Sequence, residues 1–269
     1  MGMRISIRKR SIRQCALVGL LASVGLALIP TSPPLSWGQP RWTDEQAEFA
    51  TNVEKMKGHL LVSRELYAIG QAAYAAIHAA HPVQELWPLL RGPLTQASSE
   101  LAGRVGALLE KPVREIDAGA PAKRYEDTVK QLVAVLDEAV RRMVPDEILR
   151  NLAFRGKVLQ KLIEDAEEEY EEGVKEGKIA QIVEYQDAYG FFHRAKTLFQ
   201  EMAGRLQGKD PKAAKEIEST LAIPAKGFAS VMPPATPLPE EKMKEALLKI
   251  SILTKEMTGT TPGRRGQGP

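Results

Sequence analysis

Apolar side chains recur every three to four residues from residue 43 to residue 257, and no segment alternates apolar and polar residues as a half-buried strand does. In one stretch, five apolar residues fall on a single helical face: Val129, Leu132, Val133, Leu136 and Val140. Ala, Leu, Glu and Lys are abundant and aromatic residues make up only 6% of the chain, which favours helix over strand. The sequence therefore predicts an all-α fold, an up-and-down bundle of about four to five long helices.

Stretches rich in proline, glycine and polar residues divide this helical region. We expect a helical bundle domain over residues 39–206, a Pro-rich connector over residues 207–239 and an additional C-terminal helix over residues 240–257. Thr43 and Gln46 have the spacing of a capping box, which predicts the start of the first helix. Residues 258–269 are too polar and Gly-rich to fold, and they predict a disordered tail.

Residues 1–38 have the three-part layout of a secretory signal peptide. Five basic residues come first, an apolar run extends from Ala16 to Ile29, and the small residues Ser36 and Gly38 come after it. The apolar run has 14 residues, too few for an ordinary membrane-spanning helix. We expect an exported, periplasmic protein with no membrane span after cleavage; an uncleaved N-terminal anchor is the alternative.

Cleavage after residue 38 would change the net charge of the chain and remove its cysteine. Five of the 37 basic residues and none of the 34 acidic residues lie within residues 1–38, so the remaining chain carries a formal charge of −2. A nucleic-acid partner then has no electrostatic basis. Cys15, the only cysteine, is removed as well, which excludes disulfides, thiolate metal ligands and cysteine catalysis from the mature chain.

Two of the four histidines lie three residues apart in the segment IHAAHPVQELW. On a continuous helix His78, His81 and Glu85 share one face, and imidazole with carboxylate suits a first-row divalent cation. Pro82, however, favours the first turn of a new helix, with Gln84 at the capping-box position and Glu85 near the positive end of the helix dipole. The spacing leaves both interpretations open.

Two further segments contain polar residues among apolar ones. His59 lies on the apolar face of its predicted helix, where it is either a metal ligand or a core-edge histidine bonded to a backbone carbonyl. Glu184 and Asp187 are spaced i, i+3 in an otherwise apolar and aromatic segment. An unpaired buried carboxylate is costly, so each needs a cation, an arginine or a hydroxyl as its partner.

The segments MKGHLLVSRELYAIG…HAAHPVQELW and EYEEGVKEGKIAQIVEYQDAYGFF together resemble a family of exported helical proteins of bacteria. The resemblance covers roughly residues 53–205. It implies an exported all-α domain, and no activity is assigned to the family. In architecture alone the chain is also similar to imelysin-type periplasmic iron-uptake proteins, which join His and carboxylates from facing helices, although their motif is not found at matching positions.

The motifs of common catalytic sites are missing from the sequence, which contains no HExxH, GxSxG, GxxxxGK[ST] or CxxCH. We therefore expect a binding protein of metal uptake or homeostasis that holds a divalent transition metal, iron, copper or zinc. The candidate ligands are His59, His78, His81, Glu85, Glu184 and Asp187. The alternative is a metal-free structural or interaction module of the cell envelope, with another envelope protein as its partner.

Overall fold

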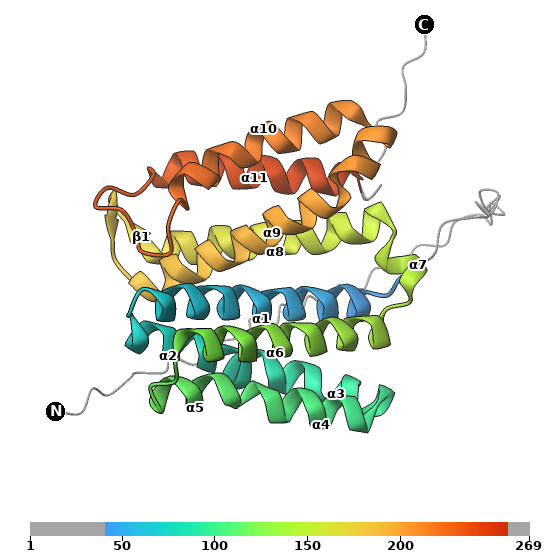
Figure 1. Cartoon of the computed structure of the whole chain (residues 1–269). Coiled ribbons are helices and arrows are strands. Elements are labelled where there is room, and N and C mark those ends of the chain that lie inside the picture. The colour runs from blue at the N-terminus through green and yellow to red at the C-terminus, as the bar shows by residue number, and fades with distance from the viewer. Residues whose placement is uncertain (1–40, 258–269) are drawn as a thin grey trace, which may run out of the picture. The chain divides into compact units, whose positions relative to one another are not determined.

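Helices make up nearly all of residues 41–257, the part of the chain that this computed structural model describes (Figure 1). Their order is α1 (Asp44–Ala68), α2 (Ala72–His81), η1 (Pro82–Leu86), α3 (Trp87–Ala97), α4 (Ser99–Leu109), α5 (Lys111–Asp117), α6 (Ala122–Met143), α7 (Asp146–Leu149), α8 (Leu152–Gly173), β1 (Val174–Lys175), β2 (Lys178–Ile179), α9 (Ile182–Lys209), α10 (Pro211–Gly227) and α11 (Glu240–Met257). The prediction of an all-α bundle is confirmed.

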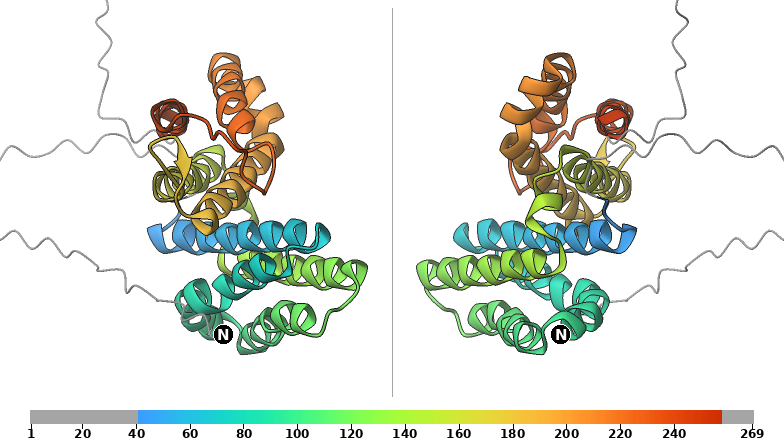
Figure 2. Two further views of the ribbon diagram at one scale, coloured as in Figure 1. Left: turned by 90° about the vertical axis from the view of Figure 1, so that its left-hand side faces the viewer. Right: turned by 90° about the vertical axis from the view of Figure 1, so that its right-hand side faces the viewer.

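The helices pack as two groups that share α1. Helices α8, α9, α10 and α11 pack against one another as a four-helix group, while α2 to α6 gather on the other side of α1. Helix α1 contacts α6 and α2 on one side and α8 and α9 on the other, as the two side views in Figure 2 show. One apolar core runs through both groups, with Leu60 of α1 and Phe192 of α9 fully buried. Helix α1 is therefore the element through which the two groups meet.

Local sequence signals explain where several helices begin. The Thr43 hydroxyl oxygen accepts the Gln46 N–H at 3.2 Å and the Gln46 side-chain oxygen accepts the Thr43 N–H at 3.1 Å, so the predicted capping box is formed. Helix α11 covers residues 240–257. Between α8 and α9, the chain reverses through a two-residue hairpin in which Gly177 adopts a φ of +70°, a conformation that glycine tolerates best.

The predicted Pro-rich connector over residues 207–239 is wrong over residues 207–227, which are almost entirely helical. Asp210 caps α10 by accepting the Ala213 N–H at 2.9 Å, and Pro211 occupies the first helical turn, where its missing N–H costs nothing. Only residues 228–239 form a loop. Since α10 and α11 pack on α8 and α9, the segments before and after residue 206, the predicted end of the bundle domain, belong to one bundle.

The predicted signal peptide (residues 1–38) and the predicted disordered tail (residues 258–269) lie outside the described residues. Within residues 41–257, none of the helices combines the length and the apolar character that a membrane span requires.

Candidate metal centre

Helices α1 and α9 approach each other closely at two glycines, Gly58 and Gly190. A Cβ built on Gly58 would lie 2.9 Å from a ring carbon of Phe191 and 3.2 Å from the carbonyl carbon of Gly190. Only a residue without a side chain fits such a backbone contact. His59 is the residue after Gly58, and Asp187 lies one turn before Gly190. The crossing therefore lets the short side chain of Asp187 reach the His59 ring.

The other two histidines come from the junction of α2 and η1. Pro82 lies within a continuous helical path, because η1 is a wide π-helical turn in which the Trp87 N–H bonds the Pro82 carbonyl. His81 keeps helical dihedral angles (φ −53°, ψ −45°) and forms no side-chain cap. Of the two interpretations of this segment, the helix start with a cap at His81 is therefore wrong, and His78 and His81 face the same side.

Four side chains converge where these elements meet. The Nδ1 atoms of His59 and His78 lie 2.7 Å and 2.9 Å from Oδ1 of Asp187. Nδ1 of His81 lies 3.3 Å from Oδ2 of the same carboxylate and 3.4 Å from Nδ1 of His59. One potential ligand atom from each of the four residues lies within 4.8 Å of all the others.

The cluster is removed from solvent. His78 is fully buried, His59 is 2% exposed, and the side chain of His81 is 15% exposed. The site therefore opens to solvent, if narrowly, on the side of His81. Phe191 packs edge-on against the His59 ring, with ring centroids 5.0 Å apart. Such a low-dielectric setting strengthens every charge interaction within the cluster.

Burial and charge act in opposite directions on the ionisable groups. Burial lowers the pKa of His59, although the neighbouring Asp187 acts to raise it. Burial disfavours ionisation of Asp187, but the His59 and His78 rings outweigh it and hold the pKa of the carboxyl well below its usual range. Burial also acts to lower the pKa of His81, yet the hydrogen bond and charge of Asp187, with Glu85 and Glu184, raise it overall.

Two of the predicted candidates lie outside this cluster. Glu85 is exposed, and Glu184 groups with the acidic residues Glu169 and Glu172. Both nevertheless lie near enough for their charges to act on His81. The fourth histidine, His193, is also separate, since its Nε2 lies 3.0 Å from the Phe228 carbonyl oxygen.

One residue of the site, Gln186, was not among the candidates that the sequence indicated. Gln186 is fully buried beside Asp187, and its Oε1 lies 2.9 Å from Nε2 of His78. Its Nε2 lies 3.7 Å from the sulfur of Met232, in the loop between α10 and α11. A polar amide next to a carboxylate in an otherwise apolar segment is the sequence signal that could have identified it.

Three imidazole nitrogens and one carboxylate oxygen make up a ligand set suited to a first-row transition metal. With metal–nitrogen bonds of about 2.05 Å, ligand atoms lie about 3.3 Å apart around a tetrahedral ion and about 2.9 Å apart at right angles. The His59 and His78 Nδ1 atoms lie 2.7 Å and 2.9 Å from Oδ1 of Asp187, the His81 Nδ1 atom lies 3.3 Å from Oδ2, and the His59 and His81 Nδ1 atoms lie 3.4 Å apart, all near these values. The four residues could therefore hold an ion with only small movements.

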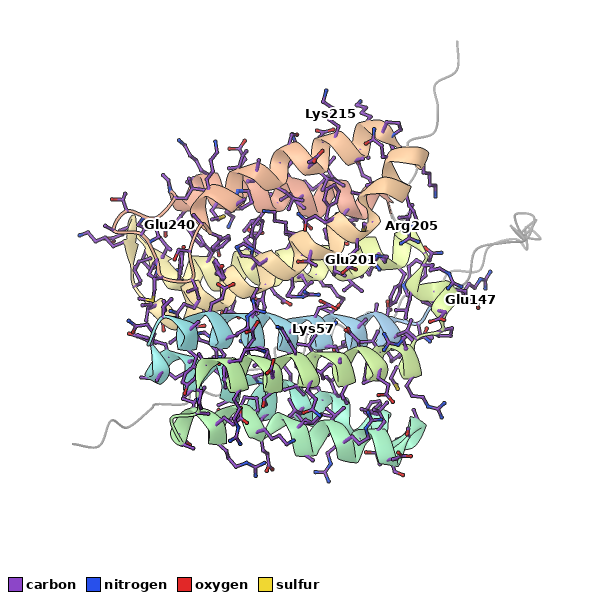
Figure 3. All side chains as sticks on the ribbon, viewed as in Figure 1. Lys57, Glu147, Glu201, Arg205, Lys215 and Glu240 are labelled. Atoms are coloured by element: carbon purple, nitrogen blue, oxygen red, sulfur yellow. The ribbon has the colours of Figure 1, made fainter. Side chains whose placement is uncertain are left out.

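A second buried polar network lies further along the α1–α9 interface. Glu54 accepts from Nζ of Lys57 at 2.7 Å, and its other oxygen accepts from Nε and an Nη of Arg194 at 2.8 Å and 2.7 Å. Lys57 also pairs with Asp137 of α6. A cavity of about 320 Å³ adjoins these residues and is also lined by Glu201 of α9. Figure 3 labels Lys57 and Glu201. Because these charged groups pair with one another, the network ties α1 to α6 and α9.

Residues 145–261, less than half of the chain, match the family of iron permease-associated 4-helix bundle domains. The matched segment contains α7 to α11 and so includes Asp187, Gln186 and Met232, whereas the three histidines of the cluster lie outside it. No match to the chain was found among curated proteins or among solved structures. The match, together with the all-helical fold, fits the general architecture of iron-uptake helical proteins.

Proposed function

We propose that this chain is an exported helical protein that binds one divalent transition metal ion through His59, His78, His81 and Asp187, and that it acts in metal uptake. The observation that carries the proposal is the convergence of three Nδ1 atoms on one carboxylate, at 2.7, 2.9 and 3.3 Å. The four residues come from α1, α2 and α9, so the site exists only in the folded protein.

The energetics of burial favour this proposal over a purely structural role. Three histidines and an aspartate placed together in an apolar core are costly unless they satisfy one another or a cation. Two imidazole Nδ1 atoms 3.4 Å apart lie at the upper limit of hydrogen-bond distances and form a poor hydrogen-bonding pair. The same spacing suits two ligands of one metal ion.

Iron is the metal that the family match favours, because the matched domains are described as iron permease-associated. A membrane permease is by the same reasoning the expected partner, and it fits an exported protein that passes iron to a transporter. Imidazole and carboxylate ligands suit iron, copper and zinc alike, so the ligand set alone does not choose among them. Export rests on the signal-peptide pattern of residues 1–38.

The test is metal uptake by the mature chain, residues 39–269, purified without a histidine tag. After equilibrium dialysis against Fe(II) under anaerobic conditions, or against Zn(II) or Cu(II), we expect about one ion per chain by elemental analysis. At a hundredfold excess over the dissociation constant, binding to the folded state should stabilise it by about 2.7 kcal/mol. Asp187→Asn and His59→Gln should lose the bound ion.

His193→Gln is the matched control, because His193 is a partly buried histidine of α9 whose hydrogen bond goes to a backbone carbonyl outside the cluster. This variant should keep the metal. If the wild-type chain is folded and takes up none of the three ions, the proposal fails. The remaining candidate would then be a metal-free structural or interaction module of the cell envelope.

A further inference from the structure

We infer that Gln186, oriented by Met232, is a positioning residue that keeps the proton of His78 on Nε2 and so turns the Nδ1 lone pair toward Asp187 and the other two histidines. The inference rests on the proposed metal-binding function and goes beyond it, because it assigns a role to two residues that are not ligands. It also predicts which ring nitrogen of His78 binds the ion.

The orientation of the Gln186 amide is determined by its two neighbours. Nε2 of Gln186 lies 3.7 Å from the Met232 sulfur, and Oε1 lies 2.9 Å from Nε2 of His78. A thioether sulfur has no hydrogen to donate and accepts only weakly. The amide NH₂ group therefore belongs on the side of Met232, and the carbonyl oxygen belongs on the side of His78.

A carbonyl oxygen can only accept a hydrogen bond, so Nε2 of His78 must carry the proton. With the Nε2 proton held by Gln186, Nδ1 is the nitrogen of His78 whose lone pair is available to an ion, and it lies 2.9 Å from Oδ1 of Asp187. A lone pair aimed at a carboxylate is repelled unless a cation lies between them. The arrangement that Gln186 imposes is therefore suited to a metal ion bound at Nδ1.

The loop that carries Met232 is held firmly against α9. The Tyr185 hydroxyl donates to the Gly227 carbonyl at 2.9 Å, one residue before the loop begins. The fully buried Phe228 packs between the rings of Tyr185 and Phe192, with centroids 5.7 Å and 5.2 Å away. Since Gln186 is the residue after Tyr185, these contacts hold the start of the Met232 loop beside the amide.

Hydrogen-bonded partners outside the ligand shell of a metal-binding histidine typically change metal affinity by about ten- to hundredfold. We therefore expect Gln186→Leu, which removes the acceptor but nearly keeps the volume, to bind Zn(II) about ten- to hundredfold more weakly. Gln186→Glu keeps an oxygen acceptor and should retain tight binding. Met232→Leu should weaken binding less than Gln186→Leu, because the acceptor remains and only its orientation is released.

The direct readout is nitrogen-15 NMR of the histidine rings, with and without Zn(II), in the mature wild-type chain. The His78 ring should show a protonated Nε2 in both states and, in the loaded state, a zinc-bound Nδ1. Gln160→Leu is the matched control, since Gln160 is a buried glutamine of α8 whose amide donates to Glu164. This control should keep wild-type zinc affinity and the wild-type His78 spectrum.

Zinc bound at Nε2 of His78, or wild-type zinc affinity in a folded Gln186→Leu variant, would overturn the inference. If the wild-type chain takes up no zinc or iron at all, the proposed function fails instead. The assignment of the Nε2 proton is then decided by the metal-free spectrum alone, in which an unprotonated Nε2 contradicts the role of Gln186.

Discussion

Gly58 of α1 and Gly190 of α9 touch backbone to backbone, and a Cβ added to Gly190 would lie 2.7 Å from the Gly58 carbonyl oxygen. This contact determines how far apart the two helices lie beside the candidate site. Neither helix can retreat without separating His59 from Asp187, whose polar atoms are 2.7 Å apart. The candidate metal site and the helix crossing are therefore a single structural feature.

Gly190→Ala should accordingly weaken metal binding, although Gly190 is not itself one of the candidate ligands. The added methyl group meets backbone, which cannot move aside as a side chain can, and overpacking of this kind costs about 1–3 kcal/mol. Chemical denaturation and a zinc titration measure the two effects. Gly204→Ala is the control, because Gly204 lies in α9 with open space around it, and it should gain up to about 1 kcal/mol from helix propensity. Equal behaviour of the two variants would contradict the proposed role of the glycine crossing.

Metal affinity should fall as the pH falls, beginning above pH 6.5, because protons compete with the ion for His81. Burial acts to lower the pKa of this histidine, but Asp187, Glu85 and Glu184 outweigh burial and raise the pKa from 6.5. In the metal-free protein, protonated His81 contributes stability below about pH 6.5 that disappears as the pH rises through the raised pKa. Zinc titrations between about pH 5 and pH 8 test this expectation. Affinity independent of pH across that range would count against His81 as a ligand.

Glu54 should be essential for the stability of the fold, although it does not belong to the candidate ligand set. Its carboxylate pairs with Lys57 and Arg194, so Glu54→Gln removes the counterion of the half-buried Arg194 and leaves the buried Lys57 with Asp137 alone. We expect a loss of about 3 kcal/mol. Burial opposes ionisation, but the two cations outweigh it and lower the pKa of Glu54 from 4.5. The carboxylate therefore contributes stability above about pH 4.5 that is lost as the pH falls. Denaturation of both proteins at pH 7 and pH 4 should show a smaller acid effect in the variant.

Export predicts a processed N-terminus. Gly38 and Ser36 are the small residues that flank a cleavage point, so the mature chain should begin near Gln39. Intact-mass measurement of the protein recovered from the periplasm of an expressing cell tests the processing. A recovered species that still contains Arg4 would instead support an uncleaved anchor.

The helical periodicity was sufficient to predict the fold, because long amphipathic helices leave a signal every three to four residues. Prolines were the main source of error. Pro211 and Pro224 both lie in α10, where the first-turn position makes Pro211 harmless, whereas Pro224 lies inside the helix and removes one of its hydrogen bonds. Composition alone could not distinguish this proline-containing helix from a connector.

Only part of the candidate site was predicted, again because a proline lies within a helical segment. His59, His78, His81 and Asp187 converge, whereas Glu85 does not join them. Glu85 lies inside the π-helical turn Pro82–Leu86, so it does not follow the regular-helix spacing from which it was predicted, and it is exposed. Gln186 and the glycine crossing could not be predicted from spacing, because both depend on contacts between distant segments.

The most direct test of metal binding at this site is X-ray absorption spectroscopy of the mature, untagged chain loaded with one equivalent of Fe(II) or Zn(II). We predict a nearest shell of nitrogen and oxygen at about 2.0–2.1 Å, with the outer-shell scattering of three imidazole rings and one carboxylate. The imidazole contribution should drop by one ring in His78→Ala and stay unchanged in His193→Gln. A shell of oxygen atoms without imidazole scattering would contradict the central claim that His59, His78, His81 and Asp187 hold the metal.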